Sequence, residues 1–429
     1  MPVARLFALV VAGAAALTLW ASPALAAGAI VLRPTTPGSA IAYSTQEAPP
    51  LVTGRVVVHF TTAGPEAPAQ TDANVNGYPD YVDQVGAAAD KALLYYETHG
   101  FRLPSPDTAG PDTKPDIYVD TLPNGVYGFT LAPAHAEGGT FVIVSPRLDT
   151  APTKPRGSVS ITVAHELVHV LQYAYVPSGK LPVWAAEGSA SALSMLVFPQ
   201  VQDQVMKDYL DAWLVAPWLP LYDERSGCVH CYGGAWWWLY LVDQSPKILP
   251  NYFAKLAADD RRGISTRIGV KQLDEAIRSS KLGSLFRVFT RFSLNLYRRG
   301  LPLGKPYSLK SSRSPRTTSV RSVFGLSTQY VPIRVPAPSR GLVVSVPSSH
   351  GPAPQVSLVV GGPRGRRILG KRFRPGQGVV ISALFRNVRE RRNVVLVVTG
   401  GRADGARYQV QYVALGPHGK LPDWIAFQR

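Results

Sequence analysis

The sequence is poor in cysteine, in charged residues and in long apolar runs, and each shortage narrows the class of protein. Two cysteines in 429 residues allow one disulfide at most. Charged residues make up only 17% against 46% hydrophobic residues, which excludes wholesale disorder and predicts a large apolar core. Beyond the N-terminal residues, no stretch is apolar for long enough to span a bilayer. The length fits two or three domains, and we find no internal repeat.

The N-terminal residues 1–26 have the pattern of a secretory signal peptide. Arg5 gives a positive start, residues 6–20 are apolar without a charge, and residues 24–26 (Ala-Leu-Ala) suit a signal peptidase. The apolar run is short for a membrane span and no stop-transfer charges follow it, although a retained anchor is the alternative. We therefore expect a secreted, extracellular protein with an exposed lead-in, rich in Pro, Ala and Thr, over residues 27–51.

The two cysteines, Cys228 and Cys231, lie close together in the string Cys-Val-His-Cys. An oxidising compartment favours a local disulfide between them. Together with His230 they would make a poor tetrahedral set for a metal ion. A redox pair is the other alternative, but no thioredoxin-like βαβ pattern surrounds them. A structural disulfide is the favoured interpretation.

Positive charge is in excess, with a formal net charge of +17, and it is unevenly spread. Much of the excess lies at 261–262, 298–299, 364–374 and 386–392. Such clusters attract anionic partners, so contact with an anionic cell surface or cell wall is one hypothesis. The clusters are not interleaved with stacking aromatic residues, so we expect no specific nucleic-acid partner. Solvated surface is the simpler interpretation.

The pattern along the chain predicts an α+β protein with two main parts. In the first part, strand-like runs occur at 56–60, 116–120 and 140–144, and apolar residues at helical spacing occur at 81–97 and 158–173. The chain is mostly helical in pattern from there to residue 300, and residues 301–319 have the composition of a linker. Short β-branched runs separated by Gly and Pro then predict an antiparallel β-sandwich over residues 320–416, followed by a tail at 417–429.

The string His-Glu-Leu-Val-His at residues 165–169 carries the strongest chemical signal. Within a helix, His165 and His169 lie one turn apart on the same face, so both imidazoles can reach one zinc ion. Glu166 follows the first ligand and can accept a proton from water bound to the metal. Two ordinary core histidines are the alternative interpretation. The pattern predicts a catalytic zinc site.

A third zinc ligand is expected because a catalytic zinc site uses three protein ligands and keeps one position open. Glu187 lies in the string Trp-Ala-Ala-Glu-Gly-Ser-Ala, far enough beyond His169 for the chain to turn and return on a second helix. His-Glu-x-x-His followed by Trp-x-x-Glu-Gly-x-Ala resembles the gluzincin branch of zinc metallopeptidases. The resemblance implies a zincin-like domain over residues 52–300, a mixed sheet plus helices, in which two histidines and this glutamate hold the metal. An ordinary surface glutamate or a helix-start residue is the alternative for Glu187.

The same resemblance implies two further roles. Gluzincins use a tyrosine or histidine beyond the third ligand to donate a hydrogen bond to the developing oxyanion. Tyr232 is the candidate here and His230 the second candidate, although a buried tyrosine and a loop histidine are simpler explanations. The family also implies an edge strand that pairs with the substrate backbone, and residues 140–144 are the candidate.

A loop that resembles the calcium loop of EF-hand and dockerin-type modules precedes the first predicted helix. Its oxygen ligands, with one backbone carbonyl from the tyrosine, would be Asp72, Asn74, Asn76, Tyr78, Asp80 and Asp83. Gly77 takes the sharp turn position, and an aspartate replaces the usual bidentate glutamate at the last position. A turn rich in Asn and Asp that binds nothing is the alternative. We expect Ca²⁺ to have a structural role.

These motifs predict a secreted, zinc-dependent metallopeptidase acting on a peptide or protein substrate. The signal peptide, the calcium-like loop and both zinc strings together are similar to a group of secreted bacterial metalloproteases assigned by motif. Two alternatives stay open. One is a zinc-binding but non-catalytic surface protein that adheres through the basic C-terminal sandwich, and the other is a cell-wall peptide amidase.

Overall fold

The computed structural model describes residues 30–109, 112–148, 158–224, 228–266, 268–301, 307–308, 316–323, 325–337, 339–346, 355–363, 367–372, 379–400 and 406–415. The expected signal peptide (1–26) and C-terminal tail (417–429) lie outside these residues. The chain divides into two compact units, Met1–Trp213 with Tyr222–Leu282 and Leu214–Leu221 with Gly283–Arg429. None of the helices in the described part is long and apolar enough to cross a membrane.

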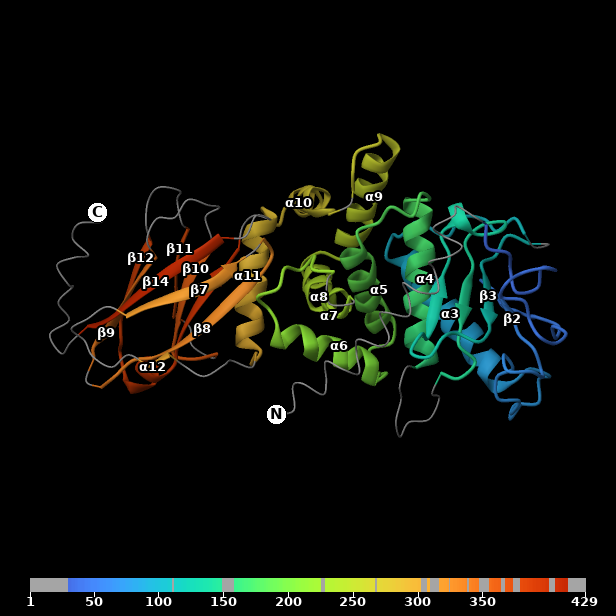
Figure 1. Cartoon of the computed structure of the whole chain (residues 1–429), viewed down its shortest axis with the longest axis horizontal. Coiled ribbons are helices and arrows are strands. Elements are labelled where there is room, and N and C mark those ends of the chain that lie inside the picture. The colour runs from blue at the N-terminus through green and yellow to red at the C-terminus, as the bar shows by residue number, and fades with distance from the viewer. Residues whose placement is uncertain are drawn as a thin grey trace. The chain divides into compact units, whose positions relative to one another are not determined.

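A mixed five-stranded sheet forms the frame of the first unit (Figure 1). Its strands are β1 (Leu51–Val52), β2 (Val57–His59), β3 (Asp116–Val119), β4 (Gly128–Thr130) and β5 (Val142–Val144), in the order β1-β2-β3-β5-β4. The central strands β2, β3 and β5 are parallel, while β1 and β4 run antiparallel to their neighbours. The strands expected at 56–60, 116–120 and 140–144 are confirmed as β2, β3 and β5. However, β5 pairs on both sides, so the expectation that 140–144 is an edge strand is wrong.

The unit also contains helices that carry the strings singled out in the sequence, and those at Asp80–Thr98 and Val159–Tyr175 pack on the sheet. They are α3 (Asp80–Thr98), the short 3-10 helix η1 (Pro133–His135), α4 (Val159–Tyr175), α5 (Val183–Val197), α6 (Gln204–Val215), α7 (Val229–Gly233), α8 (Ala235–Gln244), α9 (Ile248–Arg261) and α10 (Val270–Ser279). The helices predicted at 81–97 and 158–173 are confirmed as α3 and α4. Figure 1 shows α4 between the sheet and α5.

Helix α4 forms where the sequence combines an N-cap with an apolar stripe. The side chain of Ser158 accepts a hydrogen bond from the backbone N–H of Ile161, which satisfies one of the free donors of the first turn. Val163, Leu167 and Leu171 are fully buried. Their spacing of three to four residues gives the helix one face for the core, so its zinc string is held on a rigid element.

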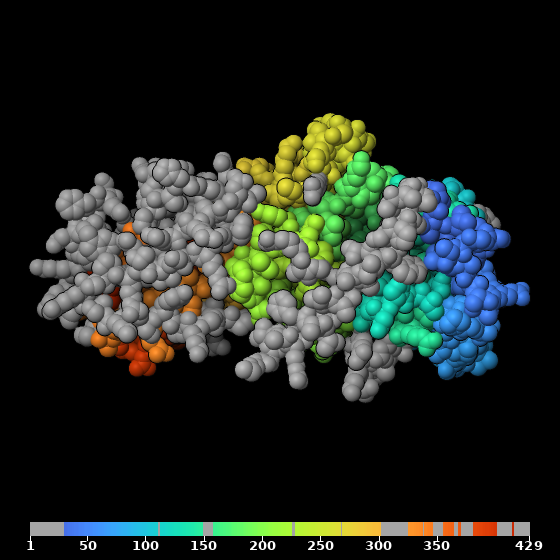
Figure 2. Space-filling model, viewed as in Figure 1, coloured from blue at the N-terminus to red at the C-terminus, as the bar shows by residue number. Residues whose placement is uncertain are grey.

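The segment after residue 30 packs against the sheet, although the sequence suggested an exposed lead-in over 27–51. Arg33 is 3% exposed and lies 2.7 Å from Asp107 through Nη2, while Nη1 also pairs with Asp116 on β3. A buried guanidinium needs such partners, because an unpaired charge in the interior is strongly destabilising. Composition alone suggested exposure because the segment is rich in Pro, Ala and Thr. These residues form the dark blue surface at one end of this unit in Figure 2.

The second unit consists of α11 (Leu285–Arg298), two sheets and the short helix α12 (Val388–Arg392). One sheet has the order β11-β10-β13-β8-β6 and the other β12-β9-β14-β7. The strands are β6 (Tyr307–Ser308), β7 (Arg316–Val323), β8 (Thr328–Arg334), β9 (Gly341–Val346), β10 (Gln355–Val360), β11 (Arg367–Arg372), β12 (Val379–Leu384), β13 (Val394–Thr399) and β14 (Ala406–Leu415). Buried residues of β8, β9, β10, β12, β13 and β14 share one apolar core.

Two details of this unit differ from the sequence expectation. The stretch 301–319, expected to be a linker, contains β6 and the first residues of β7. The pairing between β6 and β8 is parallel, whereas the other pairs in these two sheets are antiparallel. The β-branched runs of the sequence, at 330–335, 341–346, 356–360, 379–384, 394–398 and 408–413, correspond to β8, β9, β10, β12, β13 and β14, because alternating side chains can be buried on one face. The coarse expectation of an α+β protein with helices and several sheets is therefore confirmed.

Candidate metal centre

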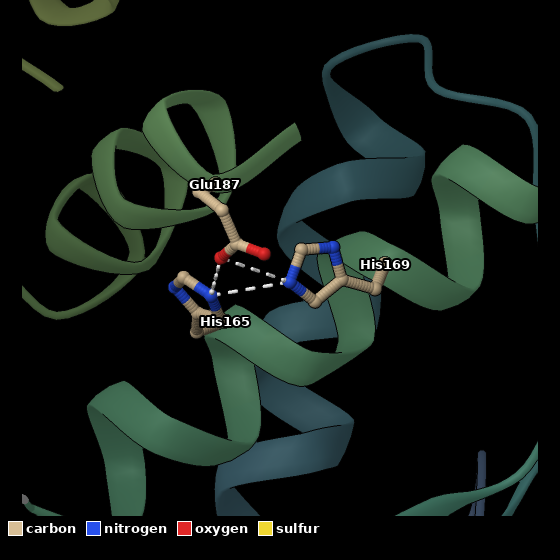
Figure 3. A group of neighbouring side chains, drawn as sticks. All are labelled: His165, His169 and Glu187. Atoms are coloured by element: carbon tan, nitrogen blue, oxygen red, sulfur yellow. Dashed lines mark hydrogen bonds and ion pairs between the residues drawn. The ribbon is translucent and has the colours of Figure 1, made fainter. Parts of the chain in front are cut away.

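The two histidines of the zinc string face the same point from successive turns of α4. His165 and His169 point their Nε2 atoms toward each other at 3.2 Å (Figure 3). His165 is 8% exposed, and the side chain of His169 is 12% exposed. The helical spacing of four residues produces this pairing directly.

Helix α5 brings Glu187 to the same point. Its Oε2 atom lies 3.2 Å from Nε2 of His165 and 3.5 Å from Nε2 of His169 (Figure 3). Among the described residues, these three side chains form the one group of His, Cys, Asp and Glu with at least three members whose ligand atoms converge, all within 4.8 Å. The structure therefore brings together the three residues that the sequence singled out.

The spacing of the three donors fits a zinc ion. An ion about 2.0–2.1 Å from each donor in tetrahedral geometry would hold the donors about 3.3 Å apart. The observed separations of 3.2, 3.2 and 3.5 Å agree with that value. Two imidazole nitrogens and one carboxylate oxygen are also a donor set that zinc prefers, with one position left for water or substrate.

Gln172 fixes the orientation of His169. Its Oε1 atom accepts a hydrogen bond from Nδ1 of His169 at 2.9 Å, so that Nε2 is the ring nitrogen directed at the metal position. Its Nε2 atom donates to the backbone oxygen of Ala186 at 3.0 Å and to Oγ of Ser189 at 3.1 Å. Gln172 is fully buried. One side chain thus joins a ligand on α4 to the helix that carries Glu187.

The electrostatics of the three ligands favour an ionised carboxylate. Burial opposes ionisation of Glu187, but the facing His169 and His165 outweigh it and hold the pKa of this carboxyl well below its usual range. Burial likewise lowers the pKa of His169, and the charge of Glu187 outweighs that effect and raises the pKa to about 9. An ionised carboxylate is the form that can bind a cation.

Glu166 lies beside these ligands but outside their cluster. It is 7% exposed, and its Oε2 atom accepts a hydrogen bond of 2.6 Å from the hydroxyl of Thr130 on β4. The same hydroxyl lies 3.1 Å from the backbone oxygen of Glu166. A carboxylate next to the ligand cluster, and not part of it, can serve as a general base.

A cavity of about 240 Å³ opens over the ligands and Glu166. Residues of β4 and of helices α4, α5 and α6 line it, together with Tyr232 of α7. The phenol ring of Tyr232 is stacked on His165, with the ring centroids 5.8 Å apart, and on Tyr209 at 4.6 Å. Burial and then the charge of Glu187 raise the pKa of Tyr232 well above its usual value, so its hydroxyl stays protonated and can donate a hydrogen bond. His230, the second candidate, does not line this cavity and stacks on Trp213.

The disulfide predicted between Cys228 and Cys231 is present. Cys231 is fully buried and precedes Tyr232 in α7. Its backbone oxygen would lie 2.9 Å from a Cβ atom added at Gly188, the residue after Glu187. Only glycine therefore permits this close packing of α5 on α7, which places the tyrosine and the glutamate in the same cavity.

The residues of the calcium-like loop gather around the turn before α3. The six expected ligands are Asp72, Asn74, Asn76, Tyr78, Asp80 and Asp83. The carboxylate of Asp72 accepts hydrogen bonds from the backbone of Asn76 at 3.2 Å and of Gly77 at 2.9 Å. Asp83 accepts from the side chains of Asn74 at 2.8 Å and of Asn76 at 3.0 Å. Gly77 has a φ of +91°, as its turn position requires. The ends of the loop are thus held together by its own side chains.

Several cavity residues were missed in the sequence. Gln172 could have been found, because it lies one turn beyond His169 on the same helix face. Tyr173, four residues beyond His169, could have been found on the same ground. Thr130 and Tyr209 could not, since each stands on a different element and only the folded chain brings it to the cavity.

Comparisons with known proteins give no family for this chain. No protein-family model matches it, and no curated protein matches it. The solved structures that match include a chain from work described as "Bacillus endospore appendages form a novel family of disulfide-linked pili". That match has 14% sequence identity and a TM-score of 0.17, and it covers 27% of this chain and 99% of the other. A similarity of this size carries no argument about function.

Proposed function

We propose that this protein is a secreted zinc metallopeptidase of the gluzincin type. The convergence of His165, His169 and Glu187 at zinc-like spacing, with an unliganded glutamate beside them, is the observation that carries the proposal. A structural zinc site is closed by four protein ligands, whereas three ligands under an open cavity suit catalysis.

Glu166 is the proposed general base. A zinc ion held by the three ligands would polarise the scissile carbonyl and lower the pKa of the attacking water. Glu166 accepts a proton from that water and passes it to the departing amine. Its burial and its hydrogen bond to Thr130 keep the carboxylate beside the cavity that it lines.

Tyr232 is the proposed donor to the oxyanion. Its ring is held between His165 and Tyr209, and its protonated hydroxyl can stabilise the negative oxygen as the water adds to the carbonyl. The disulfide that precedes it restricts the turn from which the ring projects.

The peptide substrate is proposed to bind along β4, the edge strand next to α4. In the β4–β5 pair, the backbone N–H of Ser145 bonds to Tyr127 and that of Leu131 bonds to Phe141. Antiparallel pairs alternate, so Gly128 and Thr130 are positions whose backbone groups point away from β5. An extended peptide can add there as a further strand, antiparallel or parallel.

The remaining assignments follow from the same sequence signals. We propose a zincin-like catalytic domain built on the first unit and a β-sandwich in the second, whose two sheets share one apolar core. The predicted signal peptide supports secretion, and the excess of arginine supports contact with an anionic cell surface or cell wall. The loop at Asp72–Asp83 is a proposed structural Ca²⁺ site, supported by its ligand spacing and by the turn at Gly77.

Metal removal tests the proposed function. Dialysis against a chelator should abolish cleavage of casein or a quenched peptide, and a stoichiometric amount of zinc should restore it. His169→Ala should bind no zinc, whereas the control His99→Ala, at the exposed end of α3, should bind zinc and cleave normally. A protein that holds zinc but cleaves only cell-wall peptides would be an amidase, and one that cleaves neither would be a binding protein.

A further inference from the structure

The strand β4 touches the side chain of Glu166 with two of its residues. Gly128 and Thr130 lie two positions apart, so both face the same side of the sheet, toward α4. The hydroxyl of Thr130 holds the Oε2 atom of Glu166 at 2.6 Å. A Cβ atom added at Gly128 would lie 2.6 Å from Cγ and 2.7 Å from Oε1 of Glu166, far inside van der Waals contact. The backbone conformation of Gly128 is one that other residues can adopt. Glycine is required here because the Glu166 side chain occupies the space that a Cβ atom would need.

The backbone groups of the same two residues point to the open edge of the sheet, where the proposed substrate pairs. In a strand, side chains point perpendicular to the direction in which the backbone forms hydrogen bonds. Gly128 and Thr130 therefore face α4 on the side-chain face of the strand, while their backbone groups point to the open edge of the sheet. A peptide that pairs with β4 therefore binds to the very residues that position Glu166.

We propose that Gly128 and Thr130 are positioning residues for the base, and that they couple the seating of the peptide backbone to the orientation of the Glu166 carboxylate. This inference rests on the proposed peptidase function. The hydroxyl of Thr130 fixes one carboxylate oxygen, and the missing side chain of Gly128 gives the carboxylate room beside the strand. Neither residue reaches the metal ligands, so zinc binding does not depend on them.

The substitution Thr130→Val tests the hydroxyl because it keeps the shape and the backbone pairing of β4. Since a hydrogen bond to a charged group is lost, kcat should fall roughly 10- to 100-fold. KM should change less than about twofold, because the backbone still pairs with the peptide. Thr130→Ser keeps the hydroxyl and should restore most of kcat. Gly128→Ala should lower kcat at least as much, because the carboxylate must move.

The control is Thr61→Val, which removes another buried threonine hydroxyl in the same unit, one that donates to the backbone of Ala63 at 2.9 Å. This control should leave kcat unchanged, and all four variants should keep one zinc per chain. The proposal is overturned if Thr130→Val cleaves at the wild-type kcat, if Thr130→Ser fails to restore it, or if the loss appears in KM alone.

A readout without activity separates this inference from the proposed function. Crystal structures of the zinc-loaded wild type and of Thr130→Val should show the Glu166 carboxylate on Thr130 in the first and displaced in the second. If the wild type cleaves no peptide, the peptidase proposal fails while these structures still decide the positioning. A carboxylate that occupies the same place in both structures contradicts it.

Discussion

Replacing Gln172 by methionine should weaken zinc binding and also destabilise the fold, and the two effects can be measured separately. The side chain keeps its length and its apolar stem, but it loses the bond to His169 and the two bonds to α5. Three buried hydrogen bonds at roughly 1 kcal/mol each put the loss in the free energy of unfolding near 2–4 kcal/mol. Without the acceptor on Gln172, the His169 ring can turn or change tautomer. Loss of a hydrogen-bond partner that orients a metal-binding histidine typically lowers metal affinity by about 10- to 100-fold.

The assay measures zinc affinity by competition with a chelator and stability by urea unfolding of the metal-free protein. Gln272→Met is the matched control, because Gln272 is also buried and bonds to Asp259 at 2.7 Å, away from the ligands. The control should lose stability and keep its zinc affinity. Unchanged zinc affinity in Gln172→Met, with the expected loss of stability, would refute the view that this residue orients a ligand.

The other predictions concern the N-terminal segment, a buried histidine and the calcium-like loop. Arg33→Met leaves the buried carboxylate of Asp107 without its ion-pair partner and leaves Asp116 with His59 as its ion-pair partner, so it should lower the free energy of unfolding, measured in urea, by about 3–5 kcal/mol. Burial lowers the pKa of His59, but Asp116 and Glu47 outweigh it and raise the pKa to about 9. Because this folded-state pKa lies above the unfolded value of about 6.5, the contribution of His59 is complete below about pH 6.5 and is lost as the pH approaches 9. A plot of Tm against pH should fall over that window in the wild type and fall less in His59→Gln, and equal slopes would contradict the assignment. Calcium at millimolar concentration should raise the Tm of the wild type and not that of Asp72→Ala. A wild-type Tm that does not depend on calcium would contradict the proposed calcium site.

The convergence of the two α4 histidines could be predicted because the signal is local. His165 and His169 are one helical turn apart, and the apolar residues around them give the helix one buried face whatever the rest of the chain does. Glu187 needed one further step, namely that the chain turns and returns on a second helix. The disulfide was also local, because its two cysteines are only three positions apart.

The edge strand and its threonine could not be predicted because their signal depends on pairing across the chain. β4 has three residues, one of them glycine, and its place at the edge is set by the antiparallel pairing with β5. The run at 140–144 received the edge assignment because the family resemblance implies such a strand before the active helix and two glycines precede this one, although a β-branched run suits an inner strand, which is buried on both faces. The buried position of Arg33 has the same origin, because its carboxylate partners lie more than seventy positions away.

The most direct test of the central claim compares the wild type with Glu166→Ala for zinc content and peptide cleavage in the same preparation. We expect about one zinc per chain in both proteins and cleavage in the wild type alone, because the base is removed while the three proposed ligands stay. Cleavage by Glu166→Ala at the wild-type rate, or a wild type that binds no zinc, would contradict it.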